Sequence, residues 1–173
     1  GANQREDDYG GSIKNRARLA LEVVRAVADE IGAGRTAIRL SPVTPANDIV
    51  DDNPQQLFDY LLHHLAPLGL AYIHIIEGAT GGPRELPERP FDYAALKAVY
   101  RSGGGQGAWM VNNGYDLPLA QSAVAEGADI VSFGRPYIAN PDLVERLQRG
   151  APLNTPDRAT FYGGGAAGYT DYP

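Results

Sequence analysis

The sequence contains no cysteine among its 173 residues. This absence excludes disulfide frameworks, thiolate metal sites and cysteine nucleophiles, and it agrees with a reducing compartment. Long uninterrupted apolar runs are also missing, because the longest candidate, residues 65–76, is broken by Pro67, Gly69 and His74. No secretory signal pattern opens the sequence. We therefore expect a cytoplasmic location and no membrane partner.

An excess of positive charge is missing as well. Fifteen basic side chains stand against twenty-one acidic ones, which gives a formal net charge of −6 at neutral pH. Bulk attraction to nucleic acid is therefore not expected, and any anionic ligand must be held by a local site. The hydrophobic content of 43% and the charged content of 21% are ordinary for one globular domain.

Helical and extended periodicities alternate along the chain. Ser12 is a helix cap, Leu19, Val23, Val27 and Ile31 recur at four-residue spacing after it, and Gly32 ends this helix. The same analysis predicts strands over residues 36–41, 71–76, 108–112 and 129–133. Further helices are predicted over residues 53–69, 91–102 and 117–127, and from Pro136 through Asn140-Pro141 to about Arg149.

This alternation predicts a parallel sheet with helical crossovers, and strands that are apolar on both faces agree with burial on both sides. A complete eight-stranded α/β barrel needs about 250 residues. We therefore expect one domain over residues 1–173, of α/β class, forming the carboxyl-terminal half of a TIM (β/α)8 barrel, its last four βα units. Residues 150–173 are rich in glycine and tyrosine without a period, and we expect them to form an irregular tail that closes over the site.

The loops after the last two strands are candidates for an anion site. In such barrels these loops frequently bind phosphate. Gly134 allows close backbone approach, Arg135 offers a fork of donors, and a helix start follows them. Asn112, Asn113 and Gly114 lie on the adjacent loop. The alternative is a simple turn followed by a solvated surface arginine.

Three other residues near strand ends are unusual. Arg39 interrupts an apolar strand where α/β enzymes place ligands, and it either contacts a ligand or pairs with a core carboxylate. His74 and Glu77 are read as packing or pocket-lining residues, because one histidine and one glutamate do not make a metal site. The glycines at 163–165 lack the strand and helix context of a phosphate loop, which favours a closing loop.

Several stretches together resemble the carboxyl-terminal half of the Old Yellow Enzyme family, specifically the bacterial ene reductases of the N-ethylmaleimide reductase type. They are "NQREDDYGGSIKNRARLALEVVRAV", "IRLSP", "GLAYIHIIE", "ADIVSFGRPYIANPDLVERL" and "FYGGGAAGYTDYP". The resemblance runs from Asn3 to Pro173. It implies a barrel with non-covalently bound FMN, which NADPH or NADH reduces and which delivers hydride to an alkene conjugated to a carbonyl or nitro group.

The resemblance also implies roles for individual residues. Arg39 would lie against the polar edge of the isoalloxazine ring and stabilise the anionic reduced flavin. Tyr162 would line the substrate side of the flavin. The FMN phosphate would be held by Asn112, Asn113, Gly114, Gly134 and Arg135. Residues 41–49 and 77–90 depart from the common pattern of the family, so substrate preference cannot be inherited.

The family's substrate-binding histidine pair, or histidine and asparagine, and its proton-donating tyrosine belong to a strand upstream of Gly1. Tyr9 lies after that strand, so it is not assigned as the proton donor. The resemblance therefore implies no catalytic residue in this chain and a need for the complementary N-terminal half of the barrel.

Two other functions remain open from the residues. A different phosphate-binding barrel enzyme, such as an aldolase or isomerase, would use the same loops, but Lys14 and Lys97 both lie on predicted helices, which disfavours a Schiff base. A non-catalytic flavin- or phosphate-binding module is the second alternative.

Overall fold

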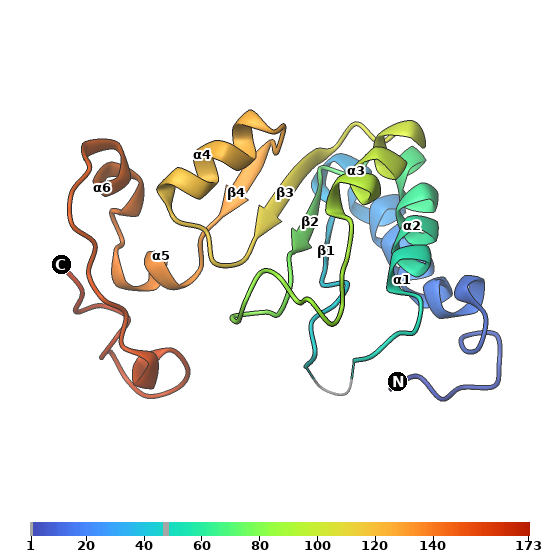
Figure 1. The fold of residues 1–173 in the computed structure, drawn as a ribbon, viewed down its shortest axis with the longest axis horizontal. Coiled ribbons are helices and arrows are strands. Elements are labelled where there is room, and N and C mark those ends of the chain that lie inside the picture. The colour runs from blue at the N-terminus through green and yellow to red at the C-terminus, as the bar shows by residue number, and fades with distance from the viewer. Residues whose placement is uncertain (1, 47–48) are drawn as a thin grey trace.

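Four parallel strands form the centre of the computed structural model, which describes residues 2–46 and 49–173 (Figure 1). Their order is sequential, and β1 and β4 form the two edges of the sheet. The cross-strand register pairs Arg39 with His74, His74 with Met110, and Asn112 with Ser132. The strands are β1 (Ala37–Leu40), β2 (Tyr72–Ile76), β3 (Ala108–Asn112) and β4 (Ile130–Ser132).

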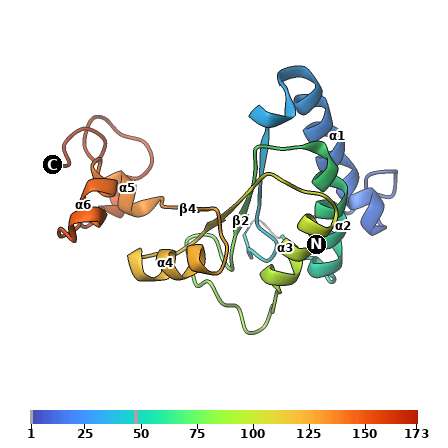
Figure 2. The same ribbon diagram turned by 90° about the horizontal axis from the view of Figure 1, so that it is seen from above.

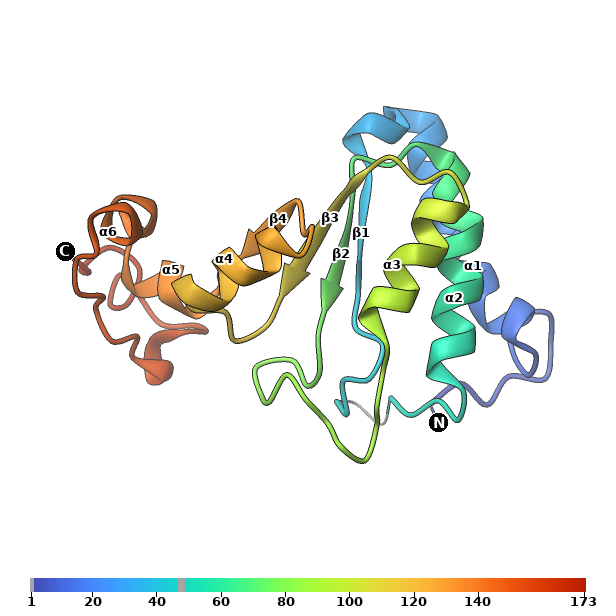
Figure 3. The ribbon, with the colours of Figure 1, turned by 45° about the horizontal axis from the view of Figure 1, so that its top comes forward.

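A helix follows each strand, and another precedes β1, which confirms the predicted alternation. Figures 2 and 3 show α1, α2 and α3 on the same side of the sheet. Side chains cap the N-termini of three α-helices. Ser12 accepts from the backbone N–H of Asn15 at the start of α1, and Asp92 and Asp116 accept backbone N–H groups in the same way at the starts of α3 and α4. The elements are α1 (Ile13–Ile31), α2 (Pro54–Leu65), α3 (Tyr93–Ser102), α4 (Leu117–Ala125), α5 (Arg135–Ala139) and α6 (Leu143–Arg149), with short 3-10 turns at Ala33–Arg35, Ala66–Leu68 and Arg158–Thr160.

The two faces of the sheet differ in this chain. Side chains alternate along a strand, and one set packs under the helices, where Ile73 and Ile75 of β2 and Trp109 of β3 are almost fully buried. The opposite set includes Arg39 and His74, which are exposed and half-buried. The hydrophobic core therefore lies between the sheet and α1 to α4, and the other face carries polar side chains.

The packing face of α1 is not the one that the four-residue spacing indicates. Ala17, Leu21 and Val24 are buried against the rest of the chain. The row with four-residue spacing is exposed to solvent instead. The exposed fractions of its side chains are 60% for Leu19, 51% for Val23, 40% for Val27 and 47% for Ile31. A narrow stripe is enough here because α1 packs mainly on α2, and it precedes the edge strand β1. The exposed row of α1 therefore has no cover within the described part of this chain.

The predicted last helix is two helices. It breaks at Asn140-Pro141, because the proline cannot donate a backbone hydrogen bond to continue α5. Asn140 is fully buried and its amide donates to the carbonyl oxygens of Pro136 and Asn154. This asparagine therefore ties the break to the tail that follows α6.

Residues 150–173 contain no α-helix or strand, only the short 3-10 turn at Arg158–Thr160. The backbone N–H of Asn154 donates to Asn140 Oδ1, and its side-chain amide donates to the carbonyl oxygen of Ala139. The Tyr172 hydroxyl accepts from the backbone of Asp157. Arg146 of α6 donates to the carbonyl oxygen of Pro173. The tail lies beside α5 and α6 in Figure 1. Within residues 2–46 and 49–173, no helix is both long and apolar enough to cross a membrane.

Candidate functional site

A pocket of about 320 Å³ lies at the carboxyl ends of β3 and β4. Parallel strands end at a common edge, so the loops that follow neighbouring strands meet there. The pocket brings together every residue that the sequence predicts for the anion site. It is lined by Asn112, Asn113, Gly114, Gly134 and Arg135, together with residues 81–82, 115–116, 132–133 and 136.

Arg135 is the cation of this pocket. Its guanidinium is exposed and donates a hydrogen bond to the carbonyl oxygen of Gly81, in the loop after β2. No carboxylate of the described chain forms an ion pair with it. The helix α5 that begins at Arg135 has only five residues, so its dipole is small and the side chain provides most of the positive potential.

Asn113 has its side chain committed to the neighbouring loop. Its amide nitrogen donates to the carbonyl oxygens of Glu77 (2.6 Å) and Ala79 (2.9 Å), and its amide oxygen accepts from the backbone of Gly81 (3.3 Å). Its φ of 110° is in the region that favours glycine. Asn113 can therefore offer a pocket ligand only its backbone, whereas its side chain holds the glycine-rich loop after β2 in place.

Asn112 belongs to a hydrogen-bonded chain across the face of the sheet opposite the helices. Its amide nitrogen lies 2.8 Å from both the carbonyl oxygen and the hydroxyl of Ser132. The same hydroxyl lies 3.2 Å from Nε2 of His74. Burial and the nearby charge of Arg39 lower the pKa of His74, so the imidazole is neutral at neutral pH.

Arg39 is exposed on this same face, beside His74. The sequence left open whether it pairs with a core carboxylate. Among residues 2–46 and 49–173 no Asp or Glu lies within ion-pair distance of it. The guanidinium is therefore available to a ligand at the carboxyl end of β1.

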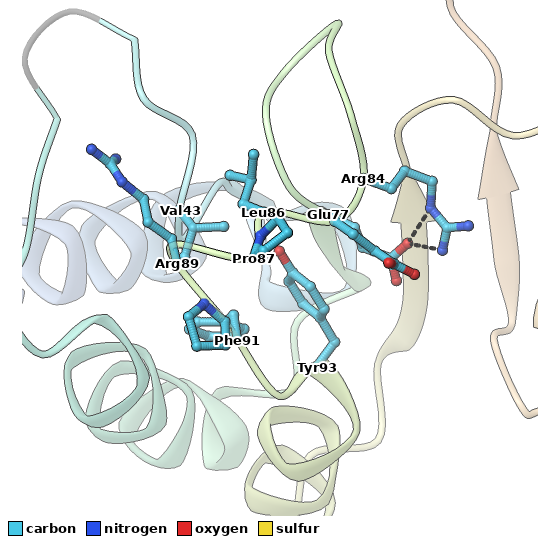
Figure 4. Close-up of a pocket in the computed structure, with 10 residues that line it drawn as sticks. Val43, Glu77, Arg84, Leu86, Pro87, Arg89, Phe91 and Tyr93 are labelled. Carbon is cyan, nitrogen blue, oxygen red and sulfur yellow. Dashed lines mark hydrogen bonds and ion pairs between the residues drawn. The ribbon is translucent and has the colours of Figure 1, made fainter.

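A second pocket, of about 500 Å³, lies between the loops after β1 and β2 (Figure 4). Its walls are mainly apolar, with Val43, Leu86 and Phe91, and Tyr93 contributes a ring. The hydroxyl of Tyr93 accepts from the backbone of Gly78 at 2.7 Å, and burial raises the pKa of this tyrosine. The loop of residues 77–90, which departs from the family pattern, thus shapes this pocket.

Glu77, Arg84 and Tyr115 form a network that the sequence did not reveal. Arg84 donates to Glu77 Oε2 at 2.6 Å and its guanidinium lies 4.4 Å from the centre of the Tyr115 ring. The Tyr115 hydroxyl donates to the same carboxylate at 2.7 Å. Burial, and then the hydrogen bond to Glu77, raise the pKa of Tyr115. No local signal could indicate the contact with Tyr115, because Tyr115 lies in the loop after β3 whereas Glu77 and Arg84 lie in the loop after β2.

Other candidates of the sequence lie elsewhere. Tyr162 is 91% exposed in the tail and lines neither pocket. Lys14 and Lys97 are on α1 and α3, as expected, and Lys97 donates to the carbonyl oxygen of Gly127. In the described part of the chain no three His, Asp or Glu side chains are grouped as a metal site.

The sequence of this chain is similar to those of known flavin-dependent proteins. Residues 1–154 match the family described as NADH:flavin oxidoreductase / NADH oxidase. The chain is 44% identical to a putative 12-oxophytodienoate reductase of Oryza sativa, covering 100% of this chain and 44% of that protein. It is 41% identical to a probable flavin mononucleotide-dependent alkene reductase of Leishmania infantum, covering 99% of this chain and 45% of that protein.

Solved structures of two members of this family have a similar fold over this chain. Morphinone reductase superposes with a TM-score of 0.86 at 44% identity, over 100% of this chain and 45% of that one. An old yellow enzyme homologue from Zymomonas mobilis superposes with a TM-score of 0.89 at 38% identity, over 99% of this chain and 47% of that one. The chain thus spans less than half the length of these relatives. Its sheet and crossover helices are the carboxyl-terminal half of a TIM barrel, and it belongs to the NADH:flavin oxidoreductase / NADH oxidase family, among the Old Yellow Enzymes.

Proposed function

We propose that this chain forms the FMN-binding half of a flavin-dependent alkene reductase. The observation that carries the proposal is the pocket where Arg135 and the loops after β3 and β4 meet. The relatives support the cofactor and the reductant, since one is named a flavin mononucleotide-dependent alkene reductase and a morphinone reductase structure contains tetrahydroNAD.

The residues present fit the phosphate of FMN. Arg135 supplies a cation that has no carboxylate partner among residues 2–46 and 49–173. A Cβ on Gly134 would meet nothing within 4 Å, which leaves open space beside the backbone. Gly114 and Asn113 contribute backbone groups to the same pocket. Charge-assisted bonds to Arg135 and backbone N–H groups are the usual means of holding phosphate.

When bound, FMN supplies hydride transfer from NADPH or NADH to an alkene activated by a carbonyl or nitro group. The role of Arg39 is to place a fixed positive charge at the carboxyl end of β1, where the polar edge of the flavin ring would lie. Tyr162 and the tail of residues 150–173 would cover the substrate side. That role requires the tail to approach the carboxyl ends of the strands.

Catalysis in this proposal needs the remaining half of the barrel. The groups that bind and protonate the alkene would come from there, because the resemblance to the family assigns them to a strand of that half. The exposed row of α1 and the open edges of β1 and β4 would be covered by the same half. Apolar surface and unpaired strand edges are otherwise unfavourable in water.

The test is reconstitution. The chain is produced with and without the polypeptide that supplies the remaining half, and FMN binding and NADPH-dependent reduction of cyclohexenone are measured. We expect a stoichiometric yellow complex and turnover only with both halves. Turnover by this chain alone would contradict the need for the other half, whereas flavin binding by the complete assembly without alkene reduction would favour the non-catalytic module.

A further inference from the structure

Ser132 joins Asn112 and His74 through hydrogen bonds. The amide nitrogen of Asn112 donates to the carbonyl oxygen and to the hydroxyl oxygen of Ser132, each at 2.8 Å. The serine hydroxyl also lies 3.2 Å from His74 Nε2, where the tautomer of the imidazole decides which of the two atoms donates. The hydrogen-bonded chain thus links β3, β4 and β2. Because a carbonyl oxygen can only accept, the bond to the Ser132 carbonyl turns the nitrogen of the Asn112 amide toward β4.

His74 lies at the β2 end of this chain of hydrogen bonds. His74 is half-buried, and Arg39 lies beside it in the sheet register. Burial and that positive charge lower the pKa of His74. The neutral imidazole is therefore favoured, and its contact with the Ser132 hydroxyl holds that hydroxyl beside the Asn112 amide.

The fixed amide leaves one atom for the pocket. Asn112 lines the pocket that also contains Arg135, and its amide oxygen has no hydrogen-bond donor among residues 2–46 and 49–173. This oxygen is also not one of the buried polar atoms without a partner in that part of the chain. Asn112 thus presents an accessible acceptor, which would repel phosphate oxygens and attract a hydroxyl or N–H group.

We infer that Asn112 accepts a hydrogen bond from a hydroxyl group on the polyol chain of a phosphorylated ligand, while Arg135 holds the phosphate in the same pocket, and that Ser132 is the positioning residue that fixes Asn112. This inference rests on the proposed function and deepens it, because FMN carries such a hydroxylated chain next to its phosphate. It assigns Asn112 to the polyol rather than to the phosphate.

The test compares two ligands that differ only in the phosphate. FMN and riboflavin affinities are measured by flavin fluorescence for the complete barrel and for Asn112→Ala, Ser132→Ala and Arg135→Ala. We expect Asn112→Ala to weaken both ligands by a similar factor, about five- to tenfold, the value of one hydrogen bond. Ser132→Ala should weaken both by a smaller factor. Arg135→Ala should weaken FMN alone.

A loss confined to FMN in Asn112→Ala would overturn the inference and place this residue on the phosphate. Unchanged affinity for both ligands in a folded Asn112→Ala would also overturn it. If Asn112→Ala does not fold, Ser132→Ala decides, since an effect on FMN alone or on neither ligand contradicts the positioning role. Absence of flavin binding by the unsubstituted assembly would instead remove the proposed function, so the two failures are distinguishable.

Discussion

Gly81 and Arg135 lie in direct contact although fifty-four residues separate them: the guanidinium donates to the Gly81 carbonyl oxygen, and a Cβ on Gly81 would lie 2.7 Å from its Nη2 atom. Gly81 also has a φ of 71°, which glycine alone adopts without strain. The loop after β2 therefore holds Arg135 in place in the pocket at the ends of β3 and β4.

The first prediction concerns this contact. Gly81→Ala should displace the Arg135 guanidinium and weaken FMN binding by about tenfold, the loss of roughly one charge-assisted hydrogen bond. Gly104→Ala is the matched control, because Gly104 has a φ of 91° and no atom near an added Cβ. Both variants should lose similar stability, but only Gly81→Ala should change FMN retention in calorimetric titration. Equal affinities in the two variants would contradict the role of Gly81.

The second prediction concerns the charge of Arg39. Arg39→Met keeps the length of the side chain and removes its charge, so the negatively charged reduced flavin should lose stabilisation. The reduction potential should fall by on the order of 30 mV, which for two electrons corresponds to about 1.4 kcal/mol. Reduction by NADPH should also be slower. Arg35→Met, at an exposed position before β1, is the control. An unchanged potential in spectroelectrochemical titration of Arg39→Met would make Arg39 a structural residue.

The third prediction concerns the pH dependence of stability through His74. The pKa of His74 is lowered in the folded state, so its contribution to stability is present above its ordinary value of about 6.5 and is lost as the pH falls through the lower folded value. Arg39→Met should raise the pKa of His74, because a nearby positive charge is removed, and should reduce this acid loss. NMR titration of the His74 ring measures the pKa. A His74 pKa that does not move in Arg39→Met would argue against the coupling.

The fourth prediction concerns Glu77 and Tyr115. The pKa of Tyr115 is raised, so its contribution to stability is complete below the ordinary value of about 10 and is lost as the pH rises through the higher folded value. Glu77→Gln should lower the pKa of Tyr115 and reduce the alkaline loss of stability. It should also cost about 1 to 3 kcal/mol at neutral pH, because the ion pair with Arg84 is broken.

Urea unfolding at several pH values measures both effects of Glu77→Gln. Glu85→Gln, an exposed carboxylate in the same loop, is the control and should change stability by less than about 0.5 kcal/mol. Similar effects of the two substitutions would show that the network around Tyr115 contributes little.

The fifth prediction concerns the exposed row of α1. Val23→Asp places a charge in this row, and it should weaken association with the remaining half of the barrel by roughly ten- to hundredfold, the value of burying one valine. Asp29→Lys, exposed on the same helix outside the row, should have little effect. Formation of the yellow complex on titrating one half with the other measures the affinity. Unchanged association of Val23→Asp would mean that this row is not at the interface.

The sequence predicted the elements of the fold, and the residues that it predicts for an anion site line one pocket in the structure. The limits of β3, the caps at Ser12 and Gly32, and the alternation of helices and strands are local properties, determined by side-chain periodicity and backbone preferences within a few residues. The meeting of the loops that carry Asn112 and Arg135 follows from the parallel order of the strands, because their carboxyl ends share one edge.

Only the tertiary structure decided how those residues are used. The row at Leu19 and Val23 matches a helical period, but which row of α1 packs depends on its contact with α2. From the sequence, the amide of Asn113 could bind an anion. In the structure it donates instead to carbonyl oxygens of the loop after β2. The chain from Asn112 through Ser132 to His74 joins strands up to 58 residues apart. Hydrogen bonds of this kind are set by strand register and loop placement, and no spacing along the sequence encodes them.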